Sequence, residues 1–123
     1  APVVIGRSPV PPDAAVRRHP VAPLLYPTHD LPAVLRSLRE AGVQRVFVEG
    51  GPTLASAFLH EGLADEVLAY VAPVLLGGAR PALTEIGVAT IAQARRLAVA
   101  AVERLGEDLL VVGRLGTTNE GEG

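Results

Sequence analysis

The 123-residue chain contains no cysteine and no lysine. Without cysteine it has no disulfide, no thiolate nucleophile and no cysteine-ligated zinc or iron–sulfur site. Without lysine it cannot form a Schiff base through a side chain of its own. Tryptophan is missing too, and aromatic residues are limited to two Tyr and two Phe. Any chemistry of this chain must therefore use carboxylates, hydroxyls, arginines, histidines or the backbone.

Histidine spacing and net charge exclude further kinds of site. His19, His29 and His60 are well separated and have no paired metal-ligand spacing such as HExxH. The net charge is −2, with acids and bases scattered, which gives no footprint for nucleic acid or an anionic membrane. There is no signal peptide and no apolar run long enough to span a bilayer. We expect a cytoplasmic protein with no metal, nucleic-acid or membrane partner.

Length and composition predict a single domain. The chain is 49% hydrophobic, which is enough to build a core and argues against intrinsic disorder except at the ends. Residues 117–123 are polar and rich in glycine, and we interpret them as a flexible tail. The predicted domain therefore spans residues 1–116.

The first third of the chain predicts two short strands and a helix. Residues 3–5 form a β-branched run ended by Gly6, and residues 24–26 form a second apolar run. The segment between them, 7–23, holds five prolines and no periodicity, which is typical of a loop. Asp30 is suited to cap a helix that carries an apolar stripe and ends near Gly42.

The middle of the chain predicts alternating strands and helices. Residues 43–48 and 67–71 are apolar runs of the kind found in buried strands. Between them, Pro52 is suited to open a helix that ends at Gly62. Strand and helix alternating through short links predict right-handed β-α-β units and a parallel sheet.

The last third predicts an antiparallel hairpin. Two extended runs, 96–104 and 108–114, are joined by Leu105-Gly106-Glu107, which is suited to a tight turn. The second run is apolar enough to be a central strand. Residues 84–94 are ambiguous, and we expect irregular structure with one helical turn.

The segment 46–59, VFVEGGPTLASAFL, carries the strongest functional signal. It runs from a predicted buried strand through Gly50-Gly51 into a helix, and ligands of open α/β sheets bind outside the carboxyl ends of strands. Glycine lacks a Cβ, so a ligand can approach the backbone closely. A helix N-terminus favours phosphate groups. The alternative interpretation is an ordinary turn whose glycines serve only backbone geometry.

This segment and the later LADEVLAYVAPVLLGG together resemble the reductase domain of the bifunctional riboflavin-biosynthesis deaminase–reductase. The resemblance covers roughly residues 3–115. It implies an α/β, dihydrofolate-reductase-like fold: a mostly parallel sheet flanked by helices, with a C-terminal antiparallel hairpin. It also implies NADPH-dependent reduction of 5-amino-6-(5-phosphoribosylamino)uracil, a small phosphoribosylaminopyrimidine, to the ribitylamino compound.

The resemblance also implies roles for single residues. Glu49 resembles the substrate-contacting glutamate of the family, and no side chain is assigned as catalytic or as a metal ligand. The residues that resemble the NADPH-lining stretches come from two segments: Gly6, Arg7, Ser8, Gly50, Gly51, Pro52, Thr53, Leu54, Ala55, Ser56 and Ala57. Arg7 and Ser8 are suited to contact the 2′-phosphate, because arginine offers a planar fork of donors to phosphate oxygens.

Several expectations remain open at this point. Arg17-Arg18-His19 is either a phosphate-holding cluster or, as we favour, a solvated loop. A complete reductase domain of the family is longer and supplies opening strands that are missing here. We therefore expect a fragment, a truncated gene product or a chain completed by another polypeptide, with weak or absent reductase activity alone. The reductases of this family are often dimeric, so a homodimer is also expected.

Three function classes are consistent with this sequence. The first is part of an NADPH-dependent pyrimidine reductase. The second is a module that binds a dinucleotide without chemistry, and the third is a structural piece used for self-association. Zinc-dependent deamination is excluded for this chain, because it has neither HxE nor PCxxC.

Overall fold

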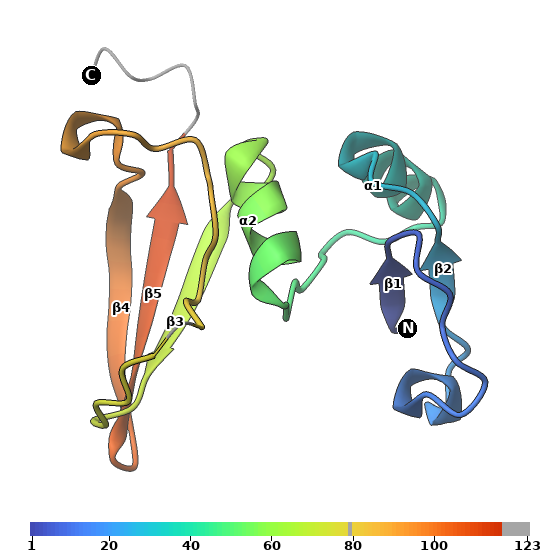
Figure 1. The fold of residues 1–123 in the computed structure, drawn as a ribbon, viewed down its shortest axis with the longest axis horizontal. Coiled ribbons are helices and arrows are strands. Elements are labelled where there is room, and N and C mark those ends of the chain that lie inside the picture. The colour runs from blue at the N-terminus through green and yellow to red at the C-terminus, as the bar shows by residue number, and fades with distance from the viewer. Residues whose placement is uncertain (79, 117–123) are drawn as a thin grey trace. The chain divides into compact units, whose positions relative to one another are not determined.

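The computed structural model describes residues 1–78 and 80–116. The chain divides into two compact units, Ala1–Val46 and Phe47–Gly123, and each is described by itself. Figure 1 shows the elements of both units in chain order. The predicted tail, 117–123, lies outside the described residues.

The first unit contains a parallel pair of strands and a helix. Strand β1, Val3–Ile5, pairs in parallel with β2, Leu24–Tyr26, and Val4 stands opposite Leu25. The proline-rich connection between them contains one 3₁₀ helix, Ala15–Arg18. Both predicted strands and the long loop are confirmed. A parallel pair requires a crossover connection, and the intervening segment provides it.

Helix α1, Leu31–Glu40, begins and ends where its sequence predicts. The carboxylate of Asp30 accepts a hydrogen bond from the backbone N–H of Ala33 at 3.1 Å, which satisfies one of the free donors of the first turn. Three residues of its apolar stripe are buried: Leu31, Val34 and Leu38. The helix lies beside the strand pair, with Tyr26 Oη 3.3 Å from Ser37 Oγ.

The cap of α1 gives the first testable prediction. Replacing Asp30 with alanine removes the acceptor of the Ala33 N–H and should lower the free energy of unfolding by about 1 kcal/mol. Urea unfolding followed by circular dichroism measures this loss. Asp13→Ala is the matched control, because Asp13 lies exposed in the loop and should change stability by less than about 0.5 kcal/mol. Equal losses in the two variants would contradict the capping role.

The predicted strand over residues 43–48 is wrong for the described chain. These residues form neither strand nor helix, and Phe47 is 65% exposed. A strand exists only when a neighbour completes its hydrogen-bond ladder, and no described strand pairs with this segment. The apolar run therefore favours a buried strand, but the described residues contain no strand that pairs with it.

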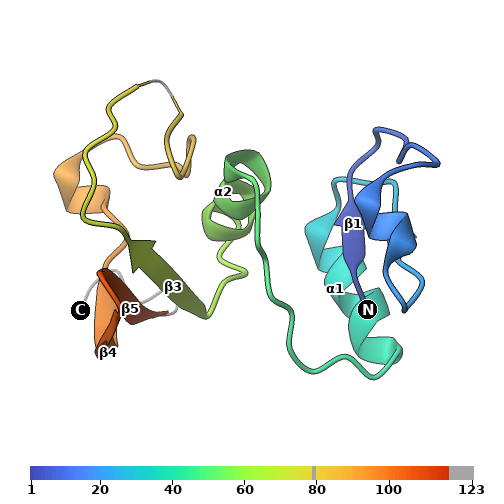
Figure 2. The same cartoon turned by 90° about the horizontal axis from the view of Figure 1, so that it is seen from below.

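The second unit consists of helix α2, Pro52–His60, and a three-stranded sheet. Strand β3, Glu66–Val71, pairs antiparallel with β5, Asp108–Leu115, which pairs antiparallel with β4, Leu97–Leu105. In both Figure 1 and Figure 2, α2 lies beside β3. The central place of β5 in this sheet confirms the prediction made from its apolar run.

The hairpin β4–β5 has the turn that its sequence predicts. Leu105 stands opposite Asp108, so Gly106 and Glu107 form a two-residue turn, and Gly106 has a φ of +62°. Two-residue hairpin turns require such left-handed conformations, which glycine adopts without a steric penalty. The ambiguous segment before the hairpin is irregular with one 3₁₀ helix, Ile91–Gln93, as expected.

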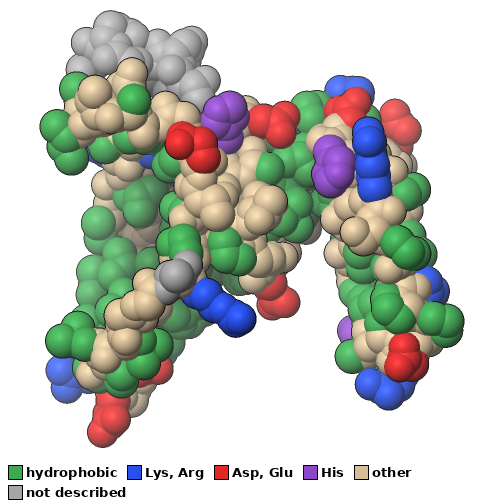
Figure 3. All heavy atoms as spheres, in the orientation of Figure 1, with side chains coloured by type: hydrophobic (Ala, Val, Ile, Leu, Met, Phe, Trp, Pro, Cys, Tyr) green, Lys and Arg blue, Asp and Glu red, His purple; other side chains and the backbone are tan. Residues whose placement is uncertain are grey.

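The α/β fold class is confirmed, with a parallel strand pair and a C-terminal antiparallel hairpin. The parallel β-α-β arrangement expected for residues 67–71 is wrong, because β3 pairs antiparallel with β5. Hydrophobic side chains are visible along the three-stranded sheet in Figure 3, and Val99 and Val102 of β4 are each 60% exposed. Among the described residues, no helix combines the length and the apolar character that crossing a membrane requires.

Candidate functional site

The Gly50-Gly51 corner leaves bare backbone before α2. All five residues from Glu49 to Thr53 are exposed. Apart from its chain neighbours, no heavy atom lies within 4 Å of the position that a Cβ of Gly50 or Gly51 would take. Gly50 has a φ of +133°, which other residues rarely adopt, and its peptide bond to Gly51 is cis. The corner is therefore accessible to a ligand that contacts the main chain.

The first turn of α2 has backbone donors with no partner inside the helix. Gly51 is the N-cap residue and provides no side-chain cap, and the first helical bond runs from the N–H of Ala55 to the carbonyl of Gly51 at 3.0 Å. The N–H groups of Thr53 and Leu54 precede that bond and have no partner within the helix, while Pro52 has no N–H. Donors at the positive end of a helix dipole suit an anionic group such as a phosphate.

Glu49 places a carboxylate next to this corner. It is exposed and immediately precedes the two glycines in the same unit as α2. A carboxylate accepts hydrogen bonds from sugar hydroxyls and attracts developing positive charge. The position therefore suits the substrate-contacting role that the resemblance implies.

The predicted cofactor-lining residues of α2 differ in how accessible they are. Thr53 is exposed, Leu54, Ala55 and Ala57 are half-buried, and Ser56 is only 2% exposed. The Ser56 hydroxyl accepts a hydrogen bond from the backbone N–H of Thr84 at 2.7 Å. This hydroxyl is therefore engaged within its own unit, which the sequence did not indicate.

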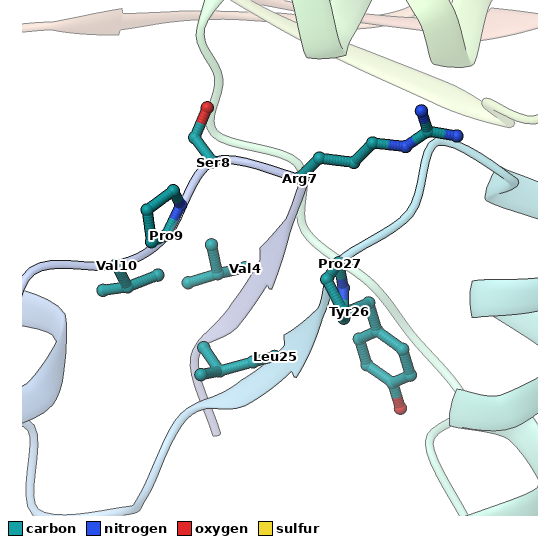
Figure 4. A pocket seen from close by; sticks show the side chains of 9 residues that line it. Val4, Arg7, Ser8, Pro9, Val10, Leu25, Tyr26 and Pro27 are labelled. Carbon is teal, nitrogen blue, oxygen red and sulfur yellow. The ribbon is translucent and has the colours of Figure 1, made fainter.

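Gly6, Arg7 and Ser8 lie together on a hollow of the first unit. The hollow has a volume of about 300 Å³ and is lined mainly by apolar residues of β1, β2 and the loop after β1. In Figure 4 the side chains of Val4, Pro9, Val10 and Leu25 gather on one side of the strand pair, and the Arg7 guanidinium extends away from them. The structure thus combines an apolar surface with an exposed cationic group at its edge.

The basic cluster at Arg17-Arg18-His19 lies in the proline-rich loop. The guanidinium of Arg17 donates to the carbonyl of Pro11 at 3.0 Å and to that of Val10 at 2.9 Å. The ring Nδ1 of His19 accepts from the N–H of Val21 at 3.0 Å. These contacts favour the interpretation of a structured, exposed loop over that of a phosphate-holding cluster.

Within residues 1–78 and 80–116, no three His, Asp or Glu side chains lie close enough together to hold a metal ion. The candidate residues of the second unit are Glu49, the glycine corner and the N-terminus of α2, and those of the first unit line the hollow beside Arg7.

Comparison with protein families decides the family. The model of the RibD C-terminal domain matches residues 1–111, which is most of the chain. This chain belongs to the RibD C-terminal domain family. The match includes both units and every candidate residue named above, so it confirms the family resemblance found in the sequence.

Two curated relatives are much longer than this chain. The RibD protein of Mycobacterium tuberculosis is 43% identical over 109 residues, covering 89% of this chain and 32% of the relative. The 2,5-diamino-6-ribosylamino-4(3H)-pyrimidinone 5′-phosphate reductase of Methanothermobacter thermautotrophicus is 40% identical over 84 residues, covering 67% of this chain and 39% of the relative. The chain thus spans about a third of the length of these curated relatives.

A solved structure confirms the fold of the domain. RibD of Acinetobacter baumannii superposes with a TM-score of 0.82 at 27% identity, covering 93% of this chain and 37% of that protein. The chain therefore has the fold of part of a RibD reductase domain, which is dihydrofolate-reductase-like, as the sequence resemblance implied.

Proposed function

We propose that this RibD C-terminal domain binds NADPH at the Gly50-Gly51 corner and the N-terminus of α2. We further propose that it takes part in reducing 5-amino-6-(5-phosphoribosylamino)uracil to the ribitylamino compound. The observation that carries the proposal is the open space over Gly50 and Gly51, beside the uncapped N–H groups of Thr53 and Leu54. A dinucleotide needs close approach to bare backbone and donors for its phosphates.

The side chains present indicate which tasks belong to the cofactor and which to the protein. NADPH supplies the hydride when it is bound, and the protein supplies position and electrostatics. The N–H groups of Thr53 and Leu54 hold a phosphate of the cofactor. The Glu49 carboxylate accepts hydrogen bonds from the ribose hydroxyls of the substrate. The same carboxylate stabilises positive charge that develops on the substrate carbon accepting the hydride.

The names of the relatives support the substrate class. The relative from Methanothermobacter thermautotrophicus is named as the reductase of a phosphorylated ribosylaminopyrimidine. The Mycobacterium tuberculosis relative is named as a riboflavin biosynthesis protein. The proposed substrate, a phosphoribosylaminopyrimidine, belongs to the same chemical class as the substrate in the first of these names.

Two assays test the proposal in sequence. Titration of the 123-residue chain with NADPH, followed by nicotinamide fluorescence, should give saturable binding. The turnover assay uses a chimera in which this chain replaces the matching region of the Mycobacterium tuberculosis RibD. It should oxidise NADPH only when the pyrimidine substrate is added. Binding without substrate-dependent oxidation would favour a dinucleotide-binding module without chemistry, and absence of binding would contradict the proposal.

Arg7 gives a prediction about cofactor preference. We propose that its exposed guanidinium, with Ser8, contacts the 2′-phosphate, which NADH lacks. A hydrogen bond to a charged group contributes roughly 1.5–3 kcal/mol, so Arg7→Ala should weaken NADPH binding by about tenfold or more. The Kd for NADH should stay within about twofold. Titrations of the variant with both dinucleotides measure the difference.

Arg36→Ala is the matched control for this measurement. Arg36 is also an exposed arginine of the first unit, on α1, and its removal changes the net charge equally. The control should leave both dissociation constants near those of the unaltered chain. If Arg7→Ala and Arg36→Ala weaken NADPH equally, a general charge effect explains the result and the specific contact is wrong.

We also propose a homodimer or completion by further polypeptide, and a cytoplasmic location. The exposed apolar residues Val99 and Val102, both on β4, support association, because large apolar side chains exposed together often mark an interaction surface. Sedimentation equilibrium of the purified chain measures its mass in solution directly.

A further inference from the structure

One segment of the second unit contacts α2 at its middle and near its C-terminus. We call residues 84–95 the strap; they connect the region after β3 to the start of β4. In Figure 1 the strap passes beside α2, and Figure 2 shows part of it near the same helix. Its contacts with α2 include those of the Thr84 amide, Gly87 and Arg95.

The contact nearest the N-terminus of α2 is buried. The backbone N–H of Thr84 donates to the Ser56 hydroxyl at 2.7 Å, and Ser56 is 2% exposed. Ser56 is the fifth of the nine residues of the helix, three residues after Thr53 and two after Leu54. This short, buried hydrogen bond fixes the strap to the middle of α2, less than one turn from the donors of the proposed cofactor site.

The contacts near the C-terminus of α2 complete the attachment. Arg95, which is half-buried, donates from Nη1 to the carbonyl of Leu59 at 2.6 Å. The Leu59 carbonyl also accepts from the backbone N–H of Gly62 at 3.1 Å, so the guanidinium is an additional donor that complements the negative end of the helix dipole. Close to this end, a Cβ on Gly87 would come within 3.0 Å of the His60 ring, so the strap and the helix are in close contact here too.

The strap is itself held in shape by local hydrogen bonds. The Gln93 side chain accepts from the N–H groups of Ala89 at 2.8 Å and Thr90 at 3.2 Å, and Gly87 donates to the Glu85 carboxylate at 2.6 Å. A segment ordered in this way can hold the helix that it contacts.

We infer that Ser56 and Arg95 are positioning residues, which hold α2 between two points of the strap so that its N-terminal donors keep the geometry needed for a dinucleotide phosphate. This inference rests on the proposed function. It assigns to Ser56 a role through the helix rather than a direct side-chain contact with the cofactor. A helix terminus binds an anion well only when its donors are already oriented, so loosening the strap should weaken binding without removing any cofactor contact.

The test measures strap order and NADPH affinity separately on the full chain. Ser56→Ala removes the buried acceptor and Arg95→Ala removes the second attachment, while Arg95→Lys keeps a cationic donor. Hydrogen exchange of residues 84–90 reports the strap, and fluorescence titration gives the Kd for NADPH. Arg96→Ala is the control, because Arg96 is an exposed neighbour in sequence with the same charge.

We expect faster exchange in the strap and a Kd about three- to tenfold higher for Ser56→Ala and Arg95→Ala, as loss of one hydrogen bond predicts. Arg95→Lys should recover part of the affinity, and Arg96→Ala should change neither quantity. If circular dichroism shows that Ser56→Ala does not fold, the positioning role is tested with Arg95→Ala, Arg95→Lys and Arg96→Ala alone. Faster exchange with an unchanged Kd would overturn the positioning role and leave the proposed function intact. Failure of the unaltered chain to bind NADPH would overturn both.

Discussion

Gly51→Val should abolish most NADPH binding while leaving the chain folded. Gly51 has a φ of −82° and a ψ of −160°, which other residues adopt, and a Cβ there meets no atom within 4 Å. The valine side chain would instead fill the space proposed for the cofactor and keep a phosphate from the N–H groups of α2. Losing hydrogen bonds to a charged group, at roughly 1.5–3 kcal/mol each, predicts a Kd higher by on the order of a hundredfold.

The fold should tolerate this change because valine costs only about 1 kcal/mol relative to glycine at a helix N-cap. Gly116→Val is the matched control, since a Cβ on Gly116 also meets nothing within 4 Å. Fluorescence titration and thermal unfolding of both variants give the affinities and the stabilities. Unchanged NADPH affinity in Gly51→Val would contradict the site, whereas equal losses in both variants would indicate a general effect of valine.

Gly51→Ser tests the same site in a second way, because it should raise the stability of the chain and lower its affinity for NADPH. Serine at an N-cap accepts a hydrogen bond from the second or third N–H of the helix, so stability should rise by about a few tenths of a kcal/mol. The bond that stabilises the helix would occupy the Thr53 or Leu54 donor proposed for the phosphate. A variant that is more stable and also binds NADPH more tightly would contradict this use of the donors.

Glu49→Gln should reduce turnover far more than it reduces cofactor affinity. The substitution keeps the shape of the side chain and its exposure but removes the negative charge proposed to stabilise the reacting carbon. Loss of one preorganised electrostatic group lowers kcat by on the order of a hundredfold in enzymes where this has been measured. The Kd for NADPH should change by less than about threefold, since a phosphate contact does not depend on this carboxylate.

The Glu49→Gln substitution is measured in the chimera with the Mycobacterium tuberculosis RibD. Steady-state NADPH oxidation gives kcat, and fluorescence titration gives the Kd. Glu103→Gln on β4 is the control, because Glu103 is an exposed glutamate of the same unit and lies outside the glycine corner. Equal loss of turnover and affinity in Glu49→Gln would count against the assigned role.

Local sequence signals predicted much of the fold. The cap at Asp30, the turn at Gly106 and the opening of α2 at Pro52 all depend on residues within a few positions of one another. Their chemistry is therefore visible in the sequence alone. The central position of β5 was also accessible, because an unbroken apolar run suits a strand with neighbours on both sides.

Pairing between distant segments was harder to predict. The run at 43–48 has a clear preference for a buried strand, yet the described residues offer it no partner. Strand β3 was expected in a parallel β-α-β arrangement and instead pairs antiparallel with β5. Periodicity gives the type of an element, while its partner depends on which other strands are present.

The part of the candidate site that lies in one short segment is predictable from the sequence, whereas its long-range contacts are not. The glycine corner and the helix that follows are contiguous, so Gly50, Gly51 and Thr53 were named from one short segment. The hydrogen bonds from Thr84 to Ser56 and from Arg95 to Leu59 join residues about thirty positions apart, and no sequence pattern indicated them. Long-range contacts of this kind emerge only from the folded chain.

Backbone NMR of the ¹⁵N-labelled chain during NADPH titration locates the bound dinucleotide on the main chain. We expect the largest shift changes on the amides of Gly50, Gly51, Thr53 and Leu54, and we expect them to saturate with the Kd measured by fluorescence. Saturable binding that leaves these four amides unchanged, or no binding at all, would contradict the proposed NADPH site.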